Sequence, residues 1–211
     1  MFAGRPIIGI AGGIGAGKSF IADLFGELGC HVLRSDDHVH AAYKREDVQQ
    51  ALRAWWGTAV FAADGSVNRR AVGEIVFNNP VERARLEGLI HPIVNAARSE
   101  EMARLAGDPR VVAWVWDVPL LFETGLNRQC DSVVFVEASE ATRLARVRRR
   151  GWDEAELKNR EKSQLPLDKK RSISDDLVSN DDGIDVAREQ VRNVLSRILT
   201  RHASPTPPDT R

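Results

Sequence analysis

The stretch of sequence that decides the fold reads Gly12-Gly13-Ile14-Gly15-Ala16-Gly17-Lys18-Ser19. It matches the pattern G-x-x-x-x-G-K-[ST], and it lies between an apolar run and a segment whose apolar side chains follow helical spacing. Glycines let the backbone wrap a phosphate group with its N–H groups pointing inward, and the following helix adds the positive end of its dipole. The sequence therefore predicts a phosphate-binding loop, or P-loop, between a first strand and a first helix.

The two polar side chains of this loop have distinct expected roles. Lys18 is expected to bridge the β- and γ-phosphates of ATP, and the Ser19 hydroxyl is expected to take a position on Mg²⁺. The backbone of the neighbouring residues would hold the nucleotide, and these residues are Gly13, Gly15, Ala16, Gly17 and Phe20. ATP and Mg²⁺ are therefore the expected cofactors.

Outward from the loop, strands and helices alternate. The first helix stops at Gly29, and an amphipathic helix closes the chain. Short apolar runs bounded by turn residues or charge are typical of strands in a parallel sheet that is covered on both faces. They occupy residues 7–11, 30–33, 111–116, 132–136 and 177–178. We expect an α/β fold, a P-loop parallel sheet of about five strands flanked by helices.

Two helical segments interrupt this alternation. The first follows the second strand, and within it Asn79-Pro80 is a cap and first-turn proline that opens a helix ending at His91-Pro92. The second follows the fourth strand, where Ser139 and Asp153 are each expected to cap a helix. The long first insertion is a candidate substrate subdomain.

Acidic residues follow two of the predicted strands. Asp36 and Asp37 come after the second strand, at the edge where open parallel sheets place their ligand crevice. A carboxylate there could orient an attacking hydroxyl and accept its proton, although capping of the next helix is the alternative. Asp117 ends the third strand, where an acid can hold Mg²⁺ through water or simply cap the following loop.

Basic residues suggest a phosphate clamp. Arginines cluster in residues 143–150, and Arg143, Arg146 and Arg150 would share one helical face. Such a face could hold transferring phosphates, and the alternative is an ordinary solvated face. Arg69 and His91 lie in the helical insertion, where ordinary surface charge is the alternative.

Composition narrows the choice of partners. Lys plus Arg equals Asp plus Glu at 30 each, so no net field favours nucleic acid or an anionic membrane. No apolar run is long enough to span a bilayer, and Cys30 and Cys130 lack metal-ligand spacing. We expect a soluble, cytoplasmic protein with a small-molecule substrate, no nucleic-acid or membrane partner, and a monomeric or weakly homo-oligomeric state.

Taken in order, these segments resemble the dephospho-CoA kinase family from Ile7 to about Leu199. The P-loop is shared by a vast superfamily, but the His-Pro and Pro-Leu-Leu-Phe-Glu segments are far more specific. Besides the loop, the matching stretches are Val-Leu-Arg-Ser-Asp at 32–36, Asn-Arg-Arg at 68–70, Leu-Glu-Gly-Leu-Ile-His-Pro at 86–92, Pro-Leu-Leu-Phe-Glu at 119–123, Arg-Val-Arg-Arg-Arg at 146–150, and 164–180.

This resemblance implies an activity and a domain plan. The activity is ATP-dependent phosphorylation of the 3′-hydroxyl of the ribose of dephospho-CoA, which gives coenzyme A in the last step of its biosynthesis. The plan is a P-loop core at 1–36, 108–138 and 171–202, a helical CoA-substrate domain at 37–107, and a helical lid at 139–170. Beyond the resemblance, residues 203–211 show no periodicity, and we expect them to form a disordered tail.

It also implies roles for single residues. Asp36 would lie near the acceptor hydroxyl, Arg146 and Arg150 would carry the lid's contacts to the phosphates, and Asn180 would lie near the adenine. The CoA substrate would contact Asp36, Arg69, His91, Pro119 and Leu120.

The sequence departs from the family pattern at a few positions. Phe20 stands where relatives often have Thr, and Ala16 stands where Ser is common, but both positions contribute chiefly backbone. Arg34 replaces a frequent acid.

Two rival functions remain to be weighed. A kinase of the nucleoside-monophosphate type would share the core and differ in its acceptor pocket. A GTPase switch would carry an Asn-Lys-x-Asp segment, which this sequence lacks, and its D-x-x-G run at 23–26 lies inside the first helix.

Overall fold

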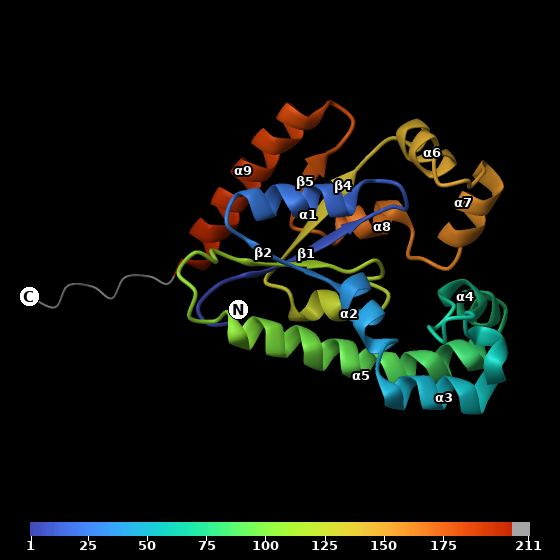
Figure 1. The fold of residues 1–211 in the computed structure, drawn as a ribbon. Coiled ribbons are helices and arrows are strands. Elements are labelled where there is room, and N and C mark those ends of the chain that lie inside the picture. Colours follow the sequence, from blue (N-terminus) through green and yellow to red (C-terminus); the bar gives the residue numbers. More distant parts are fainter. Residues whose placement is uncertain (204–211) are drawn as a thin grey trace, which may run out of the picture. The chain divides into compact units, whose positions relative to one another are not determined.

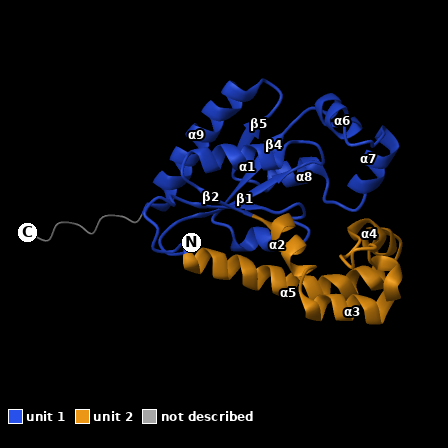
Figure 2. Ribbon diagram, viewed as in Figure 1, with its two compact units in different colours: residues 1–33, 105–211 blue, residues 34–104 orange. Residues whose placement is uncertain are grey.

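The computed structural model describes residues 1–203, so the tail expected at 203–211 lies, from residue 204 on, outside the described residues. The chain divides into two compact units (Figure 2). Unit 1 combines Met1–Leu33 with the chain from Leu105 onward, and unit 2 is Arg34–Arg104. Each unit has a hydrophobic cluster of its own.

Unit 1 is built on a five-stranded sheet with the order β2-β3-β1-β4-β5 (Figure 1). The pairs of β1 with β3, β1 with β4, and β4 with β5 are parallel. The strands are β1 Ile7–Gly12, β2 His31–Arg34, β3 Trp114–Asp117, β4 Ser132–Glu137 and β5 Asp176–Ser179. The predicted five-stranded parallel sheet is confirmed, and the carboxyl ends of its strands meet at one edge.

Helices cover this sheet. Helix α1 (Lys18–Glu27) lies beside the last helix, α9 (Ile184–His202), and both contribute to the core of unit 1 (Figure 1). Three helices connect β4 to β5, and they are α6 Glu140–Arg148, α7 Glu154–Glu161 and α8 Leu167–Ser172. A 3₁₀ turn, Leu126–Gln129, precedes β4. None of the helices in residues 1–203 is long and apolar enough to cross a membrane.

The predicted helix caps of unit 1 are confirmed. Ser139 Oγ accepts the Thr142 N–H at 3.2 Å, and Asp153 Oδ1 accepts the Glu156 N–H at 2.7 Å. Gly29, just past α1, has φ +88°, a conformation in which a side chain would be strained. Local sequence signals therefore determine where these helices begin and end.

Unit 2 is helical and packs around its longest helix. Its elements are α2 Ser35–Ala42, α3 Glu46–Trp56, a 3₁₀ turn Gly57–Val60, α4 Arg69–Asn78 and α5 Pro80–Arg104. Helix α5 contacts both α2 and α4. The hydrophobic cluster of unit 2 includes Val48 and Leu52 of α3, Val72 of α4, and Ile90 and Val94 of α5.

The predicted end of α5 at His91-Pro92 is wrong, because the helix runs for 25 residues and continues through Pro92 to Arg104. An internal proline removes one hydrogen bond and crowds the carbonyl four residues earlier, here that of Gly88. Ile90, Val94 and Met102 are buried on either side of the proline. Packing of this apolar face keeps the helix intact despite the lost bond.

Candidate active site

The loop between β1 and α1 packs so closely that glycine is required at two of its positions. Gly17 has φ +90°, and a Cβ on it would lie 2.3 Å from Asn180 Nδ2. Gly15 has φ +78°, and a Cβ there would lie 2.8 Å from the Arg143 carbonyl oxygen. The first N–H groups of α1 have no partner within the helix, so this tight loop presents donors to an anion.

Lys18 lies over its own loop. Its Nζ donates to the carbonyl oxygens of Gly12 and Gly13, at 3.1 Å each. Burial of the ammonium group and the nearby charge of Lys170 lower the pKa of Lys18 to about 8, against the opposing effects of Asp117 and Glu123. A poorly solvated cation of this kind gains from an anionic partner, and phosphate oxygens would supply one.

Arg146 and Asn180 hold the loop from outside. Arg146 Nη1 donates to the Ala16 carbonyl at 2.9 Å and to the Gly15 carbonyl at 3.3 Å. Its Nη2 donates to the Asn180 carbonyl at 2.8 Å, and Asn180 Nδ2 donates to the Ala16 carbonyl at 2.8 Å. The structure thus brings Arg146, Asn180 and the loop, all predicted to belong to the site, into direct contact.

The arginine cluster does not form the single helical face that was expected. Helix α6 ends at Arg148, so Arg150 lies in the turn beyond it, where it is exposed. Its charge is nevertheless among those that lower the pKa of Lys18. Arg143 is buried, donates to the Ile14 carbonyl at 3.3 Å and forms an ion pair with Glu161 of α7. Arg143 therefore joins the loop to two helices.

Two charged residues at the site were not predicted. Lys170 of α8 is 2% exposed, and its Nζ lies 2.8 Å from Glu123 Oε1. Burial alone would raise the pKa of Glu123, but its bonds from Lys170 and from the Leu165 N–H outweigh that effect and lower it. Glu123 ends the Pro-Leu-Leu-Phe-Glu stretch, one of those that carry the family resemblance, so the sequence did offer a reason to place it at the site. Lys170 lies in the matching stretch 164–180, but its Lys-Lys-Arg run is typical of a solvated face, so no local pattern indicated that it would be buried.

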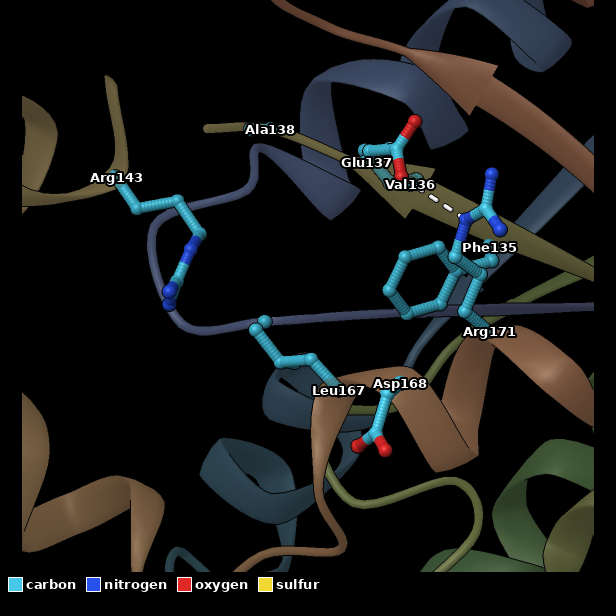
Figure 3. A pocket seen from close by; sticks show the side chains of 9 residues that line it. Phe135, Val136, Glu137, Ala138, Arg143, Leu167, Asp168 and Arg171 are labelled. Atoms are coloured by element: carbon cyan, nitrogen blue, oxygen red, sulfur yellow. Dashed lines mark hydrogen bonds and ion pairs between the residues drawn. The ribbon is translucent and has the colours of Figure 1, made fainter. Parts of the chain in front are cut away.

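A pocket of about 200 Å³ adjoins the loop at Gly13 (Figure 3). In it Arg143 faces Leu167 across the loop, and Arg171 forms a 3.0 Å ion pair with Glu137. Its other lining residues are Phe135, Val136, Ala138 and Asp168. Because pockets for whole ligands usually measure roughly 300–1,000 Å³, this one could hold only part of a nucleotide.

The expected Mg²⁺ ligands are Ser19 and Asp117. Ser19 is exposed at the start of α1, and Asp117 is buried at the end of β3, opposite Ile10 of β1. No cluster of three or more His, Cys, Asp or Glu suited to a metal occurs in residues 1–203. Mg²⁺ in phosphotransferases is held largely by phosphates and water with one or two protein oxygens, so this donor set fits it.

The remaining residues of unit 1 that were predicted to bind ligands lie beside the loop or after β3. Phe20 is partly buried against the core, so its side chain has a packing role. Pro119 and Leu120 lie in the turn that follows β3, and Pro119 is exposed. Of the cysteines, Cys30 is buried and Cys130 is half-buried.

Three predicted site residues belong to unit 2. Asp36 is exposed in the first turn of α2, Arg69 is exposed at the start of α4, and His91 is exposed in the middle of α5. Because α2 already begins at Ser35 with Arg34 as its N-cap, capping of the helix by Asp36 or Asp37 is ruled out.

The P-loop, its covering lysine and the parallel sheet define a phosphotransferase of the P-loop kinase class. The family model described as CoaE, dephospho-CoA kinase, matches residues 6–185. The chain belongs to the dephospho-CoA kinase family, whose reaction is the final step of coenzyme A biosynthesis.

Relatives and solved structures agree with this assignment. A dephospho-CoA kinase of Agrobacterium fabrum is 36% identical over 91% of this chain and 97% of its own length. A crystal structure of a Thermus thermophilus protein superposes with a TM-score of 0.79 at 32% identity, covering 92% of this chain and 97% of that one. A dephospho-CoA kinase from Campylobacter jejuni, at 22% identity, shares the fold with a TM-score of 0.65 over 95% of this chain and 99% of its own.

Proposed function

We propose that this chain transfers the γ-phosphoryl group of ATP to the 3′-hydroxyl of the ribose of dephospho-CoA. The observation that carries the proposal is the Lys18 ammonium group, which lies over the glycine loop and donates to the carbonyl oxygens of Gly12 and Gly13. Family membership supports dephospho-CoA as the acceptor.

In the proposed reaction, the acceptor oxygen attacks the γ-phosphorus, and the bond from that phosphorus to the β,γ-bridging oxygen breaks. ADP leaves, and the hydroxyl proton passes to the Asp36 carboxylate as general base. The loop N–H groups and Lys18 hold the β- and γ-phosphates, and Arg146 and Arg150 neutralise charge as it develops. Mg²⁺, held by Ser19 and through water by Asp117, would supply further charge neutralisation.

We assign the remaining predicted residues to binding of the nucleotide or of the CoA substrate, with no part in the chemical step. We assign Asn180 to the adenine, and Arg69, His91, Pro119 and Leu120 to the CoA substrate. We propose residues 37–107 as the substrate domain, residues 139–170 as a lid, and the rest of the described chain as the core. Closure of such a lid would exclude water from the phosphates.

A coupled assay tests the function. Purified protein with ATP and Mg²⁺ should form coenzyme A from dephospho-CoA and should leave AMP and CMP unphosphorylated. The Lys18→Ala variant, which loses the point charge on the phosphates, should lose turnover by about a hundredfold or more while it stays folded. Product from AMP or CMP with none from dephospho-CoA would overturn the choice of acceptor.

A further inference from the structure

The Glu123 carboxylate binds two groups of the chain that runs from the end of α7 into α8, and one of them, Lys170, is buried. Glu123 Oε1 accepts the Lys170 ammonium group and the Leu165 N–H, each at 2.8 Å. The same ammonium group also donates to Gln164 Oε1 at 2.9 Å. The side chain of Lys170 is 2% exposed and that of Glu123 is 17% exposed. The chain at 164–170 is therefore fixed to the end of the segment that follows β3.

The burial of Lys170, whose charge depends on Glu123, indicates a positional role for this pair. Exposed ion pairs add little to stability, and a buried charge must first lose its hydration, so a pair with one buried member is not kept for its strength alone. Removing the Glu123 charge, however, leaves the buried Lys170 charge uncompensated, and removing Lys170 frees the chain at 164–170 from Glu123. A pair of this kind specifies how two segments meet.

The two segments that meet here have different proposed tasks. Glu123 ends residues 119–123, whose Pro119 and Leu120 we assign to the acceptor. Residues 164–170 end the proposed lid, which carries Arg146 and Arg150 toward the phosphates.

We propose that Glu123 and Lys170 are a positioning pair that couples the acceptor segment to the lid, so that the lid closes when the acceptor is in place. This inference rests on the proposed function, because it assigns a task to a contact within the same site. Neither residue needs to touch the reacting atoms.

The coupling controls how ATP is used. In the wasteful branch the oxygen of water attacks the γ-phosphorus, the bond to the β,γ-bridging oxygen breaks, and ADP, inorganic phosphate and a proton are released. When the lid is displaced relative to residues 119–123, water can reach the phosphates and the arginines of the lid are misplaced. Hydrolysis should then rise relative to transfer.

The test is the ratio of inorganic phosphate to coenzyme A formed at saturating dephospho-CoA. Lys170→Met and Glu123→Gln should each raise this ratio by roughly tenfold or more, since small misplacements near a reacting centre cost on that scale. The double variant should raise it no further than the larger single effect, because both changes remove one contact. Glu154→Gln is the control, since Glu154 forms an exposed pair with Lys158 on α7.

The ratio separates positioning from loss of stability. Unfolded protein catalyses neither branch, so a smaller folded fraction lowers both products and leaves their ratio unchanged. If Lys170→Met does not fold, Glu123→Asp carries the same test, because it keeps both charges and shortens the arm by one methylene. A wild-type ratio in every variant that folds would overturn the coupling. Wild-type protein that forms no coenzyme A would instead overturn the proposed function.

Discussion

At the scale of single residues, the protonation state of Lys18 should determine how the affinity for ATP depends on pH. Its pKa is lowered to about 8, chiefly by burial and then by the charge of Lys170. Only the protonated amine attracts phosphate, and terminal phosphate groups are already largely ionised at pH 7, since phosphomonoesters have a second pKa of about 6. Affinity for ATP should therefore be constant near pH 7 and fall as the pH rises through about 8.

Calorimetric titration with Mg-ATP between pH 7 and pH 10 checks this expectation. The matched variant is Lys18→Arg, whose guanidinium keeps its charge throughout this range. Whatever its absolute affinity, the variant should show no decline above pH 8. An equal decline in both proteins would mean that another group controls binding.

Asp36 provides the second prediction at this scale. Asp36→Asn keeps the size of the side chain but loses the charge that accepts the hydroxyl proton, so turnover should fall by on the order of 10²-fold. The KM for ATP should barely change, because the loop is intact. Steady-state kinetics with dephospho-CoA as the varied acceptor provide the measurement.

Asp37→Asn is a close control for Asp36→Asn. Both acids are exposed in the first turn of α2, so both interact with the same helix end and neither caps it. Their effects on stability should match, and only the Asp36 change should slow the reaction. Loss of turnover in the Asp37 variant alone would assign the general base to Asp37.

At the scale of elements, the P-loop should tolerate no side chain at Gly17. A Cβ there would overlap Asn180 Nδ2 at 2.3 Å, and Asn180 would have to give up its bond to the Ala16 carbonyl. Gly125 has a similar φ of +71° but no atom within 4 Å of its Cβ position. Gly125→Ala should therefore cost only the left-handed strain, about 1–2 kcal/mol of unfolding free energy.

Gly17→Ala should cost more than Gly125→Ala and should also weaken ATP binding by roughly tenfold or more, since the loop donors must shift. Urea denaturation of the two variants compares the cost of backbone strain alone with the cost of strain plus overlap with Asn180. ATP titration shows whether the overlap also disturbs the loop. Equal unfolding free energies together with intact ATP binding in both would show that the contact with Asn180 does not shape the loop.

Comparison of the predicted with the observed strands and helices shows which elements local sequence patterns can identify. Strands were predictable because each is a short apolar run between turn residues, as in Ile7–Gly12 and Ser132–Glu137. Helix α8 was not, because Leu167–Ser172 is too short and too charged to show helical periodicity. The end of α5 was misplaced because packing around Pro92 overrides a local helix-breaking signal.

In the candidate site, too, local patterns predicted some residues, and other residues depend on tertiary contacts that local patterns do not show. Glycine positions, Lys18 and the capping residues follow from local rules, so the loop could be found from its pattern. The burial of Lys170 against Glu123 depends on two segments far apart in the chain meeting in space. No local pattern reports such a meeting.

At the scale of the whole molecule, the proposed ligands are assigned to different units. Lys18, Arg146 and Asn180 belong to unit 1, whereas Asp36, Arg69 and His91 belong to unit 2. Each unit has its own hydrophobic cluster, so each can open locally by itself. A ligand that binds one unit should therefore slow the opening of that unit more than that of the other. Backbone hydrogen exchange can follow both units in one experiment.

Mg-ATP alone should slow exchange at the loop, in residues 143–150 and around Asn180, and leave residues 34–104 near their free rates. At a hundredfold excess over its dissociation constant, it can add at most about 2.7 kcal/mol of protection. Dephospho-CoA alone should slow exchange in unit 2 and at residues 119–123. Lys18→Ala should lose the first pattern and keep the second, because its acceptor contacts are unchanged. Protection of α4 and α5 by ATP alone would place nucleotide contacts in unit 2, and an acceptor that protects only unit 1 would remove residues 37–107 from the substrate site.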